Sequence, residues 1–274
     1  MLRLPSGLHV RVVEAGPRSG RPVVLLPGWA ASAFTYRYQL PALAAAGYRA
    51  VAVDLKGLGF SDKPTGAGEY SFDAMLRHVA EVVAAVAQEP AVVAQSMAGR
   101  LAIELGVSER PVVAGLVLVS PVGIGRVPFI GLARLLTPRA ADVVAPLLIG
   151  RRTVRMALRM AYGGRSPVSE DAVEEYLAPR QFPGFARALR ALVHDFDWAP
   201  VPASRLEALS VPTLVIRGTL DRLVIGPPRR HVDGLQRAEL LVLDDAGHAL
   251  NEQCPEPTNA ALLAFLARWY PPAG

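Results

Sequence analysis

Three polar side chains have the types and the chain order that nucleophilic catalysis requires. Ser96 stands between the apolar run 91–95 and a helical pattern, and Asp221 and His248 follow later apolar runs. In such a set the serine attacks a carbonyl carbon and the histidine accepts its proton and later returns it. The aspartate orients the imidazolium and stabilises its charge. If the fold brings them together, these residue types could carry out nucleophilic catalysis.

The surroundings of Ser96 favour a nucleophile on a sharp strand-to-helix turn. Such a serine adopts a strained backbone, and its neighbours two positions away must be small. Ala94 and Ala98 are small, although the usual pattern has glycine at both places, and Gly99 stands one position late. Each residue also has an ordinary explanation: an N-cap for Ser96, a turn for Asp221 and a surface loop for His248.

The elements that must position these residues are predicted from hydrophobic periodicity. Up to Ser120, short apolar runs alternate with helical patterns, which is typical of a largely parallel sheet covered by helices. The carboxyl ends of parallel strands lie at the same edge of a sheet. The three residues are therefore expected to converge at that edge. Strands are expected at 9–14, 22–26, 49–55, 91–95, 112–120, 212–217 and 238–243, and helices at 36–46, 71–88, 97–106 and 256–269.

Residues 121–205 differ from the rest, because they show only helical patterns interrupted by prolines. We expect a core domain of residues 1–120 and 206–274 and a helical insertion between them. The insertion holds 12 arginines against 7 acidic residues, so it carries the whole net charge of +5. Apolar runs at 127–136 and 143–149 accompany these arginines, which predicts amphipathic helices and no nucleic-acid partner.

Several motifs together resemble the α/β-hydrolase superfamily over essentially the whole chain. Residues 25–29 (Leu-Leu-Pro-Gly-Trp) stand where the family has an oxyanion loop, and residues 54–62 match its D-x-x-G-x-G-x-S turn. Ser96, Asp221 and Gly247-His248 match the triad positions, and residues 247–256 match the common ending. The resemblance implies an α/β fold with a mostly parallel central sheet flanked by helices, and a helical cap at 121–205.

The resemblance also implies the remaining parts of the site. The backbone N–H groups of Trp29 and Met97 would form the oxyanion hole. Pro27 replaces the histidine that commonly braces this loop, and the Gln95 amide either reaches the pocket or packs. Five aromatic or aliphatic residues are candidates for lining the cap, although packing within the cap is the default for such side chains. These are Phe129, Leu132, Tyr162, Phe196 and Trp198.

We expect a hydrolase of carboxylic esters with small to medium, hydrophobic groups. A serine at position 96 argues against the haloalkane-dehalogenase and epoxide-hydrolase branches, which the resemblance associates with an aspartate nucleophile. A carbon–carbon bond hydrolase, a lactonase, a perhydrolase and a non-catalytic ligand-binding protein remain alternatives. Without phosphate loops or metal-ligand spacing, no cofactor and no metal are expected, and water is the second substrate.

Composition limits the remaining possibilities. The 274 residues, 51% hydrophobic and 19% charged, fit one large globular chain. Cys254 is the only cysteine and cannot form an intramolecular disulfide. The sequence starts without a continuous apolar secretion segment and has no membrane-length apolar run, so a cytoplasmic protein without integral membrane association is expected. Its oligomeric state stays open.

Other polar residues are expected to be structural. Asp244 and Asp245 are interpreted as turn residues, and Glu252 as a residue that serves the start of the last helix. Gly57, Gly59 and Ser61 are interpreted as parts of a turn. The remaining histidines, which lack a Gly-His context after a strand, are His9, His78, His194 and His231.

Overall fold

The computed structural model describes residues 1–107, 111–138, 149–226, 232, 235 and 237–273. Its main feature is a seven-stranded sheet in the order β3-β5-β4-β6-β7-β8-β9, in which the edge strand β3 is antiparallel to β5 and all other pairs are parallel. The strands are β3 (Val12–Ala15), β4 (Pro22–Leu26), β5 (Arg49–Val53), β6 (Ala91–Gln95), β7 (Gly115–Val119), β8 (Thr213–Gly218) and β9 (Ala238–Leu243). A separate antiparallel pair consists of β1 (Leu2–Arg3) and β2 (His9–Val10).

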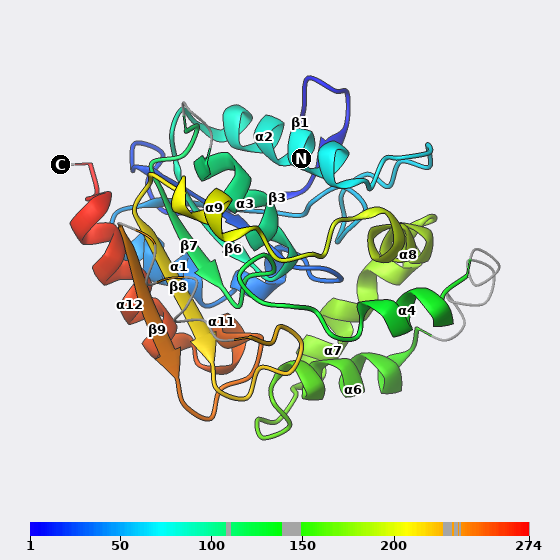
Figure 1. Ribbon diagram of the computed structural model, residues 1–274. Coiled ribbons are helices and arrows are strands. Elements are labelled where there is room, and N and C mark those ends of the chain that lie inside the picture. Colours follow the sequence, from blue (N-terminus) through cyan, green and yellow to red (C-terminus); the bar gives the residue numbers. More distant parts are fainter. Residues whose placement is uncertain (108–110, 139–148, 227–231, 233–234, 236, 274) are drawn as a thin grey trace.

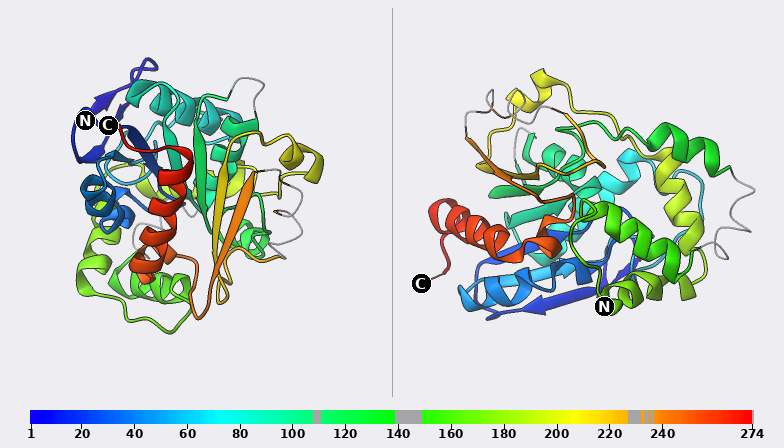
Figure 2. Two further views of the ribbon diagram at one scale, coloured as in Figure 1. Left: turned by 90° about the vertical axis from the view of Figure 1, so that its left-hand side faces the viewer. Right: turned by 90° about the horizontal axis from the view of Figure 1, so that it is seen from below.

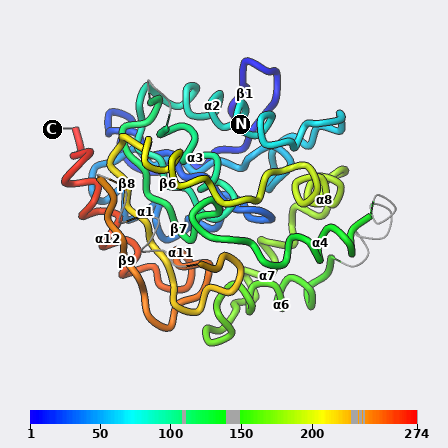
Figure 3. The backbone as a smooth tube through the Cα atoms, in the orientation of Figure 1, coloured from blue at the N-terminus to red at the C-terminus, as the bar shows by residue number. Residues whose placement is uncertain are grey.

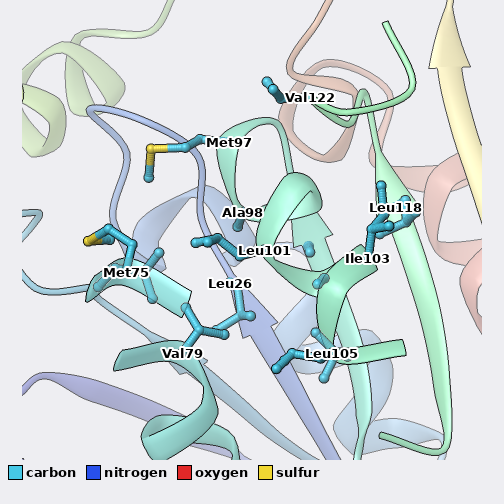
Figure 4. Close-up of a cluster of buried hydrophobic side chains, with 14 of the residues drawn as sticks. Leu26, Met75, Val79, Met97, Ala98, Leu101, Ile103, Leu105, Leu118 and Val122 are labelled. Atoms are coloured by element: carbon cyan, nitrogen blue, oxygen red, sulfur yellow. The ribbon is translucent and has the colours of Figure 1, made fainter. Parts of the chain in front are cut away.

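Helices cover both faces of the sheet because its strands are apolar on both sides. Along β4, Val24 and Leu26 pack toward α2 (Phe72–Val86) and α3 (Met97–Val107), whereas Val23 and Leu25 pack toward α1 (Gln39–Ala45) and α12 (Pro255–Trp269). Figure 2 shows α1 and α12 side by side on one face. Figure 4 shows Leu26 packed between side chains of α2 and α3 on the other.

The predicted elements agree with the structure except where one pattern contains two elements. The run 9–14 is divided between β2 and β3, which belong to different sheets. The pattern 36–46 is divided between a 3-10 helix, η1 (Ala33–Tyr36), and α1. Pro41 explains the second difference, because its ring would clash with the carbonyl of Arg37 if one helix ran through it.

Between β7 and β8 the described chain is helical, as predicted. This segment contains α4 (Ile130–Leu136), α6 (Arg151–Ala161), α7 (Glu170–Leu177), η2 (Ala178–Gln181), α8 (Phe185–Asp195) and α9 (Ala203–Glu207). Figures 1 and 3 show α4, α6, α7 and α8 grouped at one side of the molecule, opposite α12. Within the described residues of 121–205 there is no strand, only isolated bridges such as Val122 with Gly125.

The insertion is attached to the core in two ways. The inner side of α8 joins the main core through Ala188 and Leu192, and Phe196 follows it there. Helices α6 and α7 form a second, small cluster around Leu158 and Val173, against which Phe34 of η1 packs. None of the described helices is long and apolar enough to cross a membrane. The domain boundaries at 120 and 206 stay a prediction.

Candidate active site

Ser96 lies on the sharp turn between β6 and α3. Its φ of 54° falls in the left-handed region, which a residue with a side chain adopts only when its surroundings enforce it. Hydrogen bonds do so here: the Ser96 N–H donates to the Val119 carbonyl at 2.9 Å, and the Ser96 carbonyl accepts from Gly99 and Val122, both at 2.9 Å. The strand-to-helix turn expected for a nucleophile is therefore present.

The alanines beside this turn, Ala94 and Ala98, are both fully buried in the core. Gly99 has a separate role. A Cβ at this position would come within 2.6 Å of the Pro121 Cβ, so its absence lets α3 pack against the segment that follows β7. Gly99, one position after the usual glycine, therefore allows α3 to pack closely at the turn.

Asp221 and His248 are hydrogen-bonded to each other. The distance from His248 Nδ1 to Asp221 Oδ2 is 2.9 Å, and both side chains are buried. Asp221 Oδ1 accepts from the backbone N–H groups of Leu223 and Val224, at 2.9 and 3.0 Å. In the neutral tautomer that donates from Nδ1, the Nε2 of His248 remains an acceptor, as a general base requires.

Burial and charge act in opposite directions on Asp221. Burial alone would raise the pKa of its carboxyl, but the charge and hydrogen bond of His248 and the Val224 N–H lower it. Arg217, whose guanidinium lies 4.0 Å from Oδ2, also lowers it. The net result is a pKa below the ordinary value for aspartate, so Asp221 stays ionised and available to an imidazolium.

The loops that carry these two residues are adjacent because β8 and β9 are parallel neighbours. The N–H of Thr219 donates to the Leu243 carbonyl at 3.0 Å, and that of Leu220 donates to Ala246 at 2.8 Å. A Cβ at Gly218 would collide with the backbone of residues 246 and 247. This close approach brings Asp221, which follows β8, next to His248, which follows β9.

The loop after β4 lies against the nucleophile turn. The N–H of Gly28 donates to Gln95 Oε1 at 3.0 Å, and a Cβ at Gly28 would come within 2.8 Å of the Ser96 Cβ. Among the described residues, the backbone N–H groups of Trp29 and Met97 donate to no other protein group. Both N–H groups are therefore available to bind an oxyanion. Their role as the oxyanion hole stays a proposal. Gln95 supports the loop in which Pro27 has replaced the expected histidine.

Comparison with known proteins agrees with this arrangement. The model of the Alpha/beta hydrolase family matches residues 23–261. The chain belongs to this family. It is 33% identical over 278 residues to RutD of Variovorax paradoxus (strain S110), whose name assigns it to carbamate hydrolysis, covering 95% of this chain and 96% of the relative.

More distant members of the α/β hydrolase family also match along nearly the full length. Epoxide hydrolase A of Mycobacterium tuberculosis is 26% identical over 314 residues, covering 95% of both chains. Among solved structures, a meta-cleavage product hydrolase of Pseudomonas fluorescens (CumD) superposes with a TM-score of 0.81 at 23% identity, covering 97% of this chain and 96% of that one. This likeness shows the α/β-hydrolase fold.

The residues predicted to line the substrate pocket of this α/β hydrolase lie in different environments. Phe196 is 1% exposed and packs edge-on against Phe72 and Trp198, whose indole N–H donates to Leu192. Phe129 precedes α4 and packs on the main core. Leu132, by contrast, is 59% exposed on α4. Their contact with a substrate stays a prediction.

Two cavities of the structure lie elsewhere. One of about 270 Å³ is lined by residues 180–187, and one of about 330 Å³ is lined by ten residues that include Lys56, Glu69 and His78. Neither is lined by Ser96, Asp221 or His248. Within the described part of the chain, no group of three or more potential ligands is arranged to hold a metal ion.

The interpretation of Glu252 was wrong. It lies in α11 (Leu250–Gln253), three residues before α12 begins at Pro255, and its buried carboxylate accepts hydrogen bonds from Thr35, Arg37, Tyr162 and Tyr176. It therefore does not serve the start of α12. Sequence reasoning missed this cluster because its members are up to 217 positions apart and follow no common pattern.

The other residues interpreted as structural have structural contacts. Gly59 adopts a φ of 48°, and a Cβ there would collide with Asp54, whose carboxylate accepts from Ala33 and Phe60 at 2.6 and 2.7 Å. The turn prediction for this motif is therefore confirmed. The histidines outside the site contact Asp62 (from His9), the Lys56 N–H (from His78) and Thr137 (from His194), and His231 lies outside the described residues.

Proposed function

We propose that this α/β hydrolase cleaves carboxylic esters with small to medium, hydrophobic groups, with Ser96 as nucleophile, His248 as general base and acid, and Asp221 as its partner. Two observations carry the proposal: the 2.9 Å hydrogen bond from His248 Nδ1 to Asp221 Oδ2, and the φ of 54° at Ser96 on the strand-to-helix turn. A left-handed φ at a serine costs free energy and persists only where its surroundings enforce it. A hydrogen-bonded Asp–His pair is what a serine nucleophile needs for acyl transfer.

In the proposed reaction, Ser96 Oγ attacks the ester carbonyl carbon while His248 Nε2 takes the hydroxyl proton. The tetrahedral oxyanion is held by the backbone N–H groups of Trp29 and Met97. The carbon–oxygen bond to the alcohol then breaks, and His248 returns the proton to the leaving oxygen. Water, activated by the same histidine, hydrolyses the acyl-enzyme and restores Ser96.

Helices α4, α6, α7 and α8 would act as the cap that selects the substrate. They lie at one side of the molecule (Figure 1), and α6 is joined to the His248 loop by the hydrogen bond from the His248 N–H to the Ala161 carbonyl. Apolar side chains dominate α4, so we propose that the substrate carries a hydrophobic acyl or alcohol group. The likeness to RutD adds carbamates, which share an electrophilic acyl carbon with esters, as a second class to test.

The nucleophile is tested with a fluorophosphonate. We expect one mass label at Ser96 in the wild-type protein and none in Ser96→Ala. Ser210→Ala, which changes another serine of the chain, serves as the control and should retain the label. Labelling of a different serine would overturn the assignment.

The substrate class is tested with a panel. Turnover of p-nitrophenyl esters should peak at short or medium acyl chains, because each added methylene gains about 0.8 kcal/mol of burial only while the pocket has room. The panel also contains a phenyl carbamate, a lactone, a vinylogous 1,5-diketone acid, and peroxide with acetate. Faster cleavage of the diketone than of every ester would establish the carbon–carbon hydrolase alternative instead. Binding without turnover, in a protein that resists labelling, would establish the non-catalytic one.

A further inference from the structure

The buried carboxylate of Glu252 joins two parts of the chain that are distant in sequence. At the end of η1, Thr35 Oγ1 and an Arg37 guanidinium nitrogen donate to it at 2.7 and 2.6 Å. From the insertion, the hydroxyls of Tyr162, at 3.1 Å, and Tyr176 also donate. Four donors on two oxygens satisfy an ionised carboxylate, which is an acceptor only. We call these five residues the Glu252 cluster.

The environment of the cluster keeps both tyrosines protonated. Burial, followed by the charge of Glu252, raises the pKa of Tyr162 and of Tyr176 above the ordinary value, so each hydroxyl remains a donor. The Phe34 ring packs edge-on against Tyr176, with ring centroids 6.4 Å apart, and the Arg37 guanidinium lies 4.3 Å from the centroid of Phe34. The cluster is therefore packed as well as hydrogen-bonded.

The same part of the insertion contacts the backbone of the proposed base. Tyr162 directly follows Ala161, the last residue of α6, and the Ala161 carbonyl accepts from the N–H groups of His248 and Ala249 at 2.6 and 3.3 Å. A Cβ at Gly247 would collide with the backbone of residues 161–163. The end of α6 is thus attached to the His248 loop by its backbone and to Glu252 by its next side chain.

This end of α6 also contacts the loop of the proposed acid. Gly163 has a φ of 66°, and a Cβ there would come within 2.9 Å of the Leu220 Cβ, one residue before Asp221. A displacement of residues 161–163 would therefore act on the backbones beside both His248 and Asp221. Proton transfer depends steeply on such geometry, since a shift of about 1 Å can cost a hundredfold in rate.

We propose that Tyr162 and Tyr176 are positioning residues that act through Glu252: by anchoring the end of α6, they hold the Ala161 carbonyl where it sets the place of His248. This inference rests on the proposed function, because it assigns the cluster a role in the reactivity of Ser96. The insertion would then hold the proposed base, His248, in place in addition to covering the substrate.

The test removes only the tyrosine hydroxyls. Tyr162→Phe, Tyr176→Phe and the double variant are compared with Tyr70→Phe. This control removes the hydrogen bond of another buried tyrosine, 3.0 Å to the Pro64 carbonyl, which does not involve the Glu252 cluster. Two quantities are measured: the rate and half-saturation concentration of fluorophosphonate labelling at Ser96, and the hydrogen exchange of the His248 amide by NMR.

We expect the double variant to label about tenfold more slowly at saturation, with a half-saturation concentration within about twofold of wild type. The His248 amide should exchange about tenfold faster, because its acceptor, the Ala161 carbonyl, is no longer held in place. Tyr70→Phe should change neither quantity. Glu252→Gln, which keeps the shape of the side chain without its charge, should change both in the same direction as the double variant.

The outcomes separate this inference from the proposed function. A wild-type protein that labels at Ser96 and a double variant that labels equally fast would overturn the positioning role alone. Equal slowing in Tyr70→Phe would also overturn it, since general destabilisation would then explain the effect. A wild-type protein that does not label would overturn the proposed function, and the positioning role with it.

Discussion

The side-chain oxygen of Gln95 accepts a hydrogen bond from the backbone N–H of Gly28, at 3.0 Å. Gln95 is the last residue of β6 and directly precedes Ser96, whereas Gly28 directly precedes Trp29 in the loop after β4. One bond therefore links the proposed nucleophile to the proposed oxyanion loop. We propose that it braces this loop, in which Pro27 stands in place of the expected histidine.

Removal of this acceptor should impair the chemical step. In Gln95→Met, which keeps the length of the side chain, the loop loses its bond and the Trp29 N–H becomes less well placed for the oxyanion. Complete loss of one oxyanion donor costs about 3 kcal/mol, so a loosened donor should lower kcat for a p-nitrophenyl ester about tenfold, with KM nearly unchanged. Steady-state kinetics check this. An unaltered kcat would contradict the bracing role of Gln95.

Substitution of Gly28 by alanine should be more damaging. The new Cβ would collide with Gln95 Oε1 and come within 2.8 Å of the Ser96 Cβ, so the loop must move away from the nucleophile. We expect kcat/KM to fall about a hundredfold or more, the effect of a misplacement near 1 Å.

Gly131→Ala is the matched control for Gly28→Ala. Gly131 lies in α4, where a Cβ meets nothing within 4 Å, so alanine should leave kcat/KM unchanged and stabilise the helix by about 0.5–1 kcal/mol. Ester kinetics and urea unfolding of both variants check the pair. Equal activity in the two variants would show that the space at Gly28 is not needed.

Ser96, Asp221 and His248 should act as one unit. If they do, Ser96→Ala alone should cost about as much activity as any double or triple substitution, because the residual rate no longer depends on the other members. Asp221→Asn should be severe by itself, since it removes the charge that stabilises the imidazolium. The kcat of all seven single, double and triple combinations is the measurement. Multiplicative losses would argue against a triad.

His78 should make the stability of the fold depend on pH. Its burial, followed by the charge of Lys56, lowers its pKa to about 3, and its Nε2 accepts the Lys56 N–H at 2.9 Å. In the unfolded chain the imidazole takes up a proton near pH 6.5. The unfolded state thus binds the additional proton between pH 6.5 and 3, so the free energy of unfolding should fall as the pH falls, by up to about 1.4 kcal/mol per pH unit.

This contribution is isolated by His78→Gln, whose amide oxygen can replace the acceptor without a titrating group. Urea unfolding at pH 7 and pH 5 should show a smaller acid loss of stability in this variant than in wild type. His9→Gln, at an exposed position, is measured beside it as the histidine control. If His78→Gln loses as much stability as wild type, groups other than His78 cause the acid sensitivity.

The sequence by itself determined the elements and the order of the proposed catalytic residues. The predicted ranges 22–26 and 91–95 coincide with β4 and β6, because a strand buried on both faces is visible as a short apolar run bounded by breakers. The range 238–243 coincides with β9, an edge strand that is only partly buried. The pairing of Asp221 with His248 could be expected as well, since the parallel strands β8 and β9 bring their carboxyl ends to one edge, the edge at which β6 leads into Ser96. The strand ranges follow from local sequence patterns, and the expected meeting of the residues follows from the topology of the sheet.

Only the tertiary structure decided which side chains support that edge. The partner of Gln95 is 67 positions away, and Glu252 meets Thr35 across 217 positions. A buried polar group must find hydrogen-bond partners wherever the fold brings them, so its sequence neighbours do not identify them. For this reason Glu252, adjacent in sequence to the last helix, could not be recognised beforehand as the acceptor for two tyrosines of the insertion.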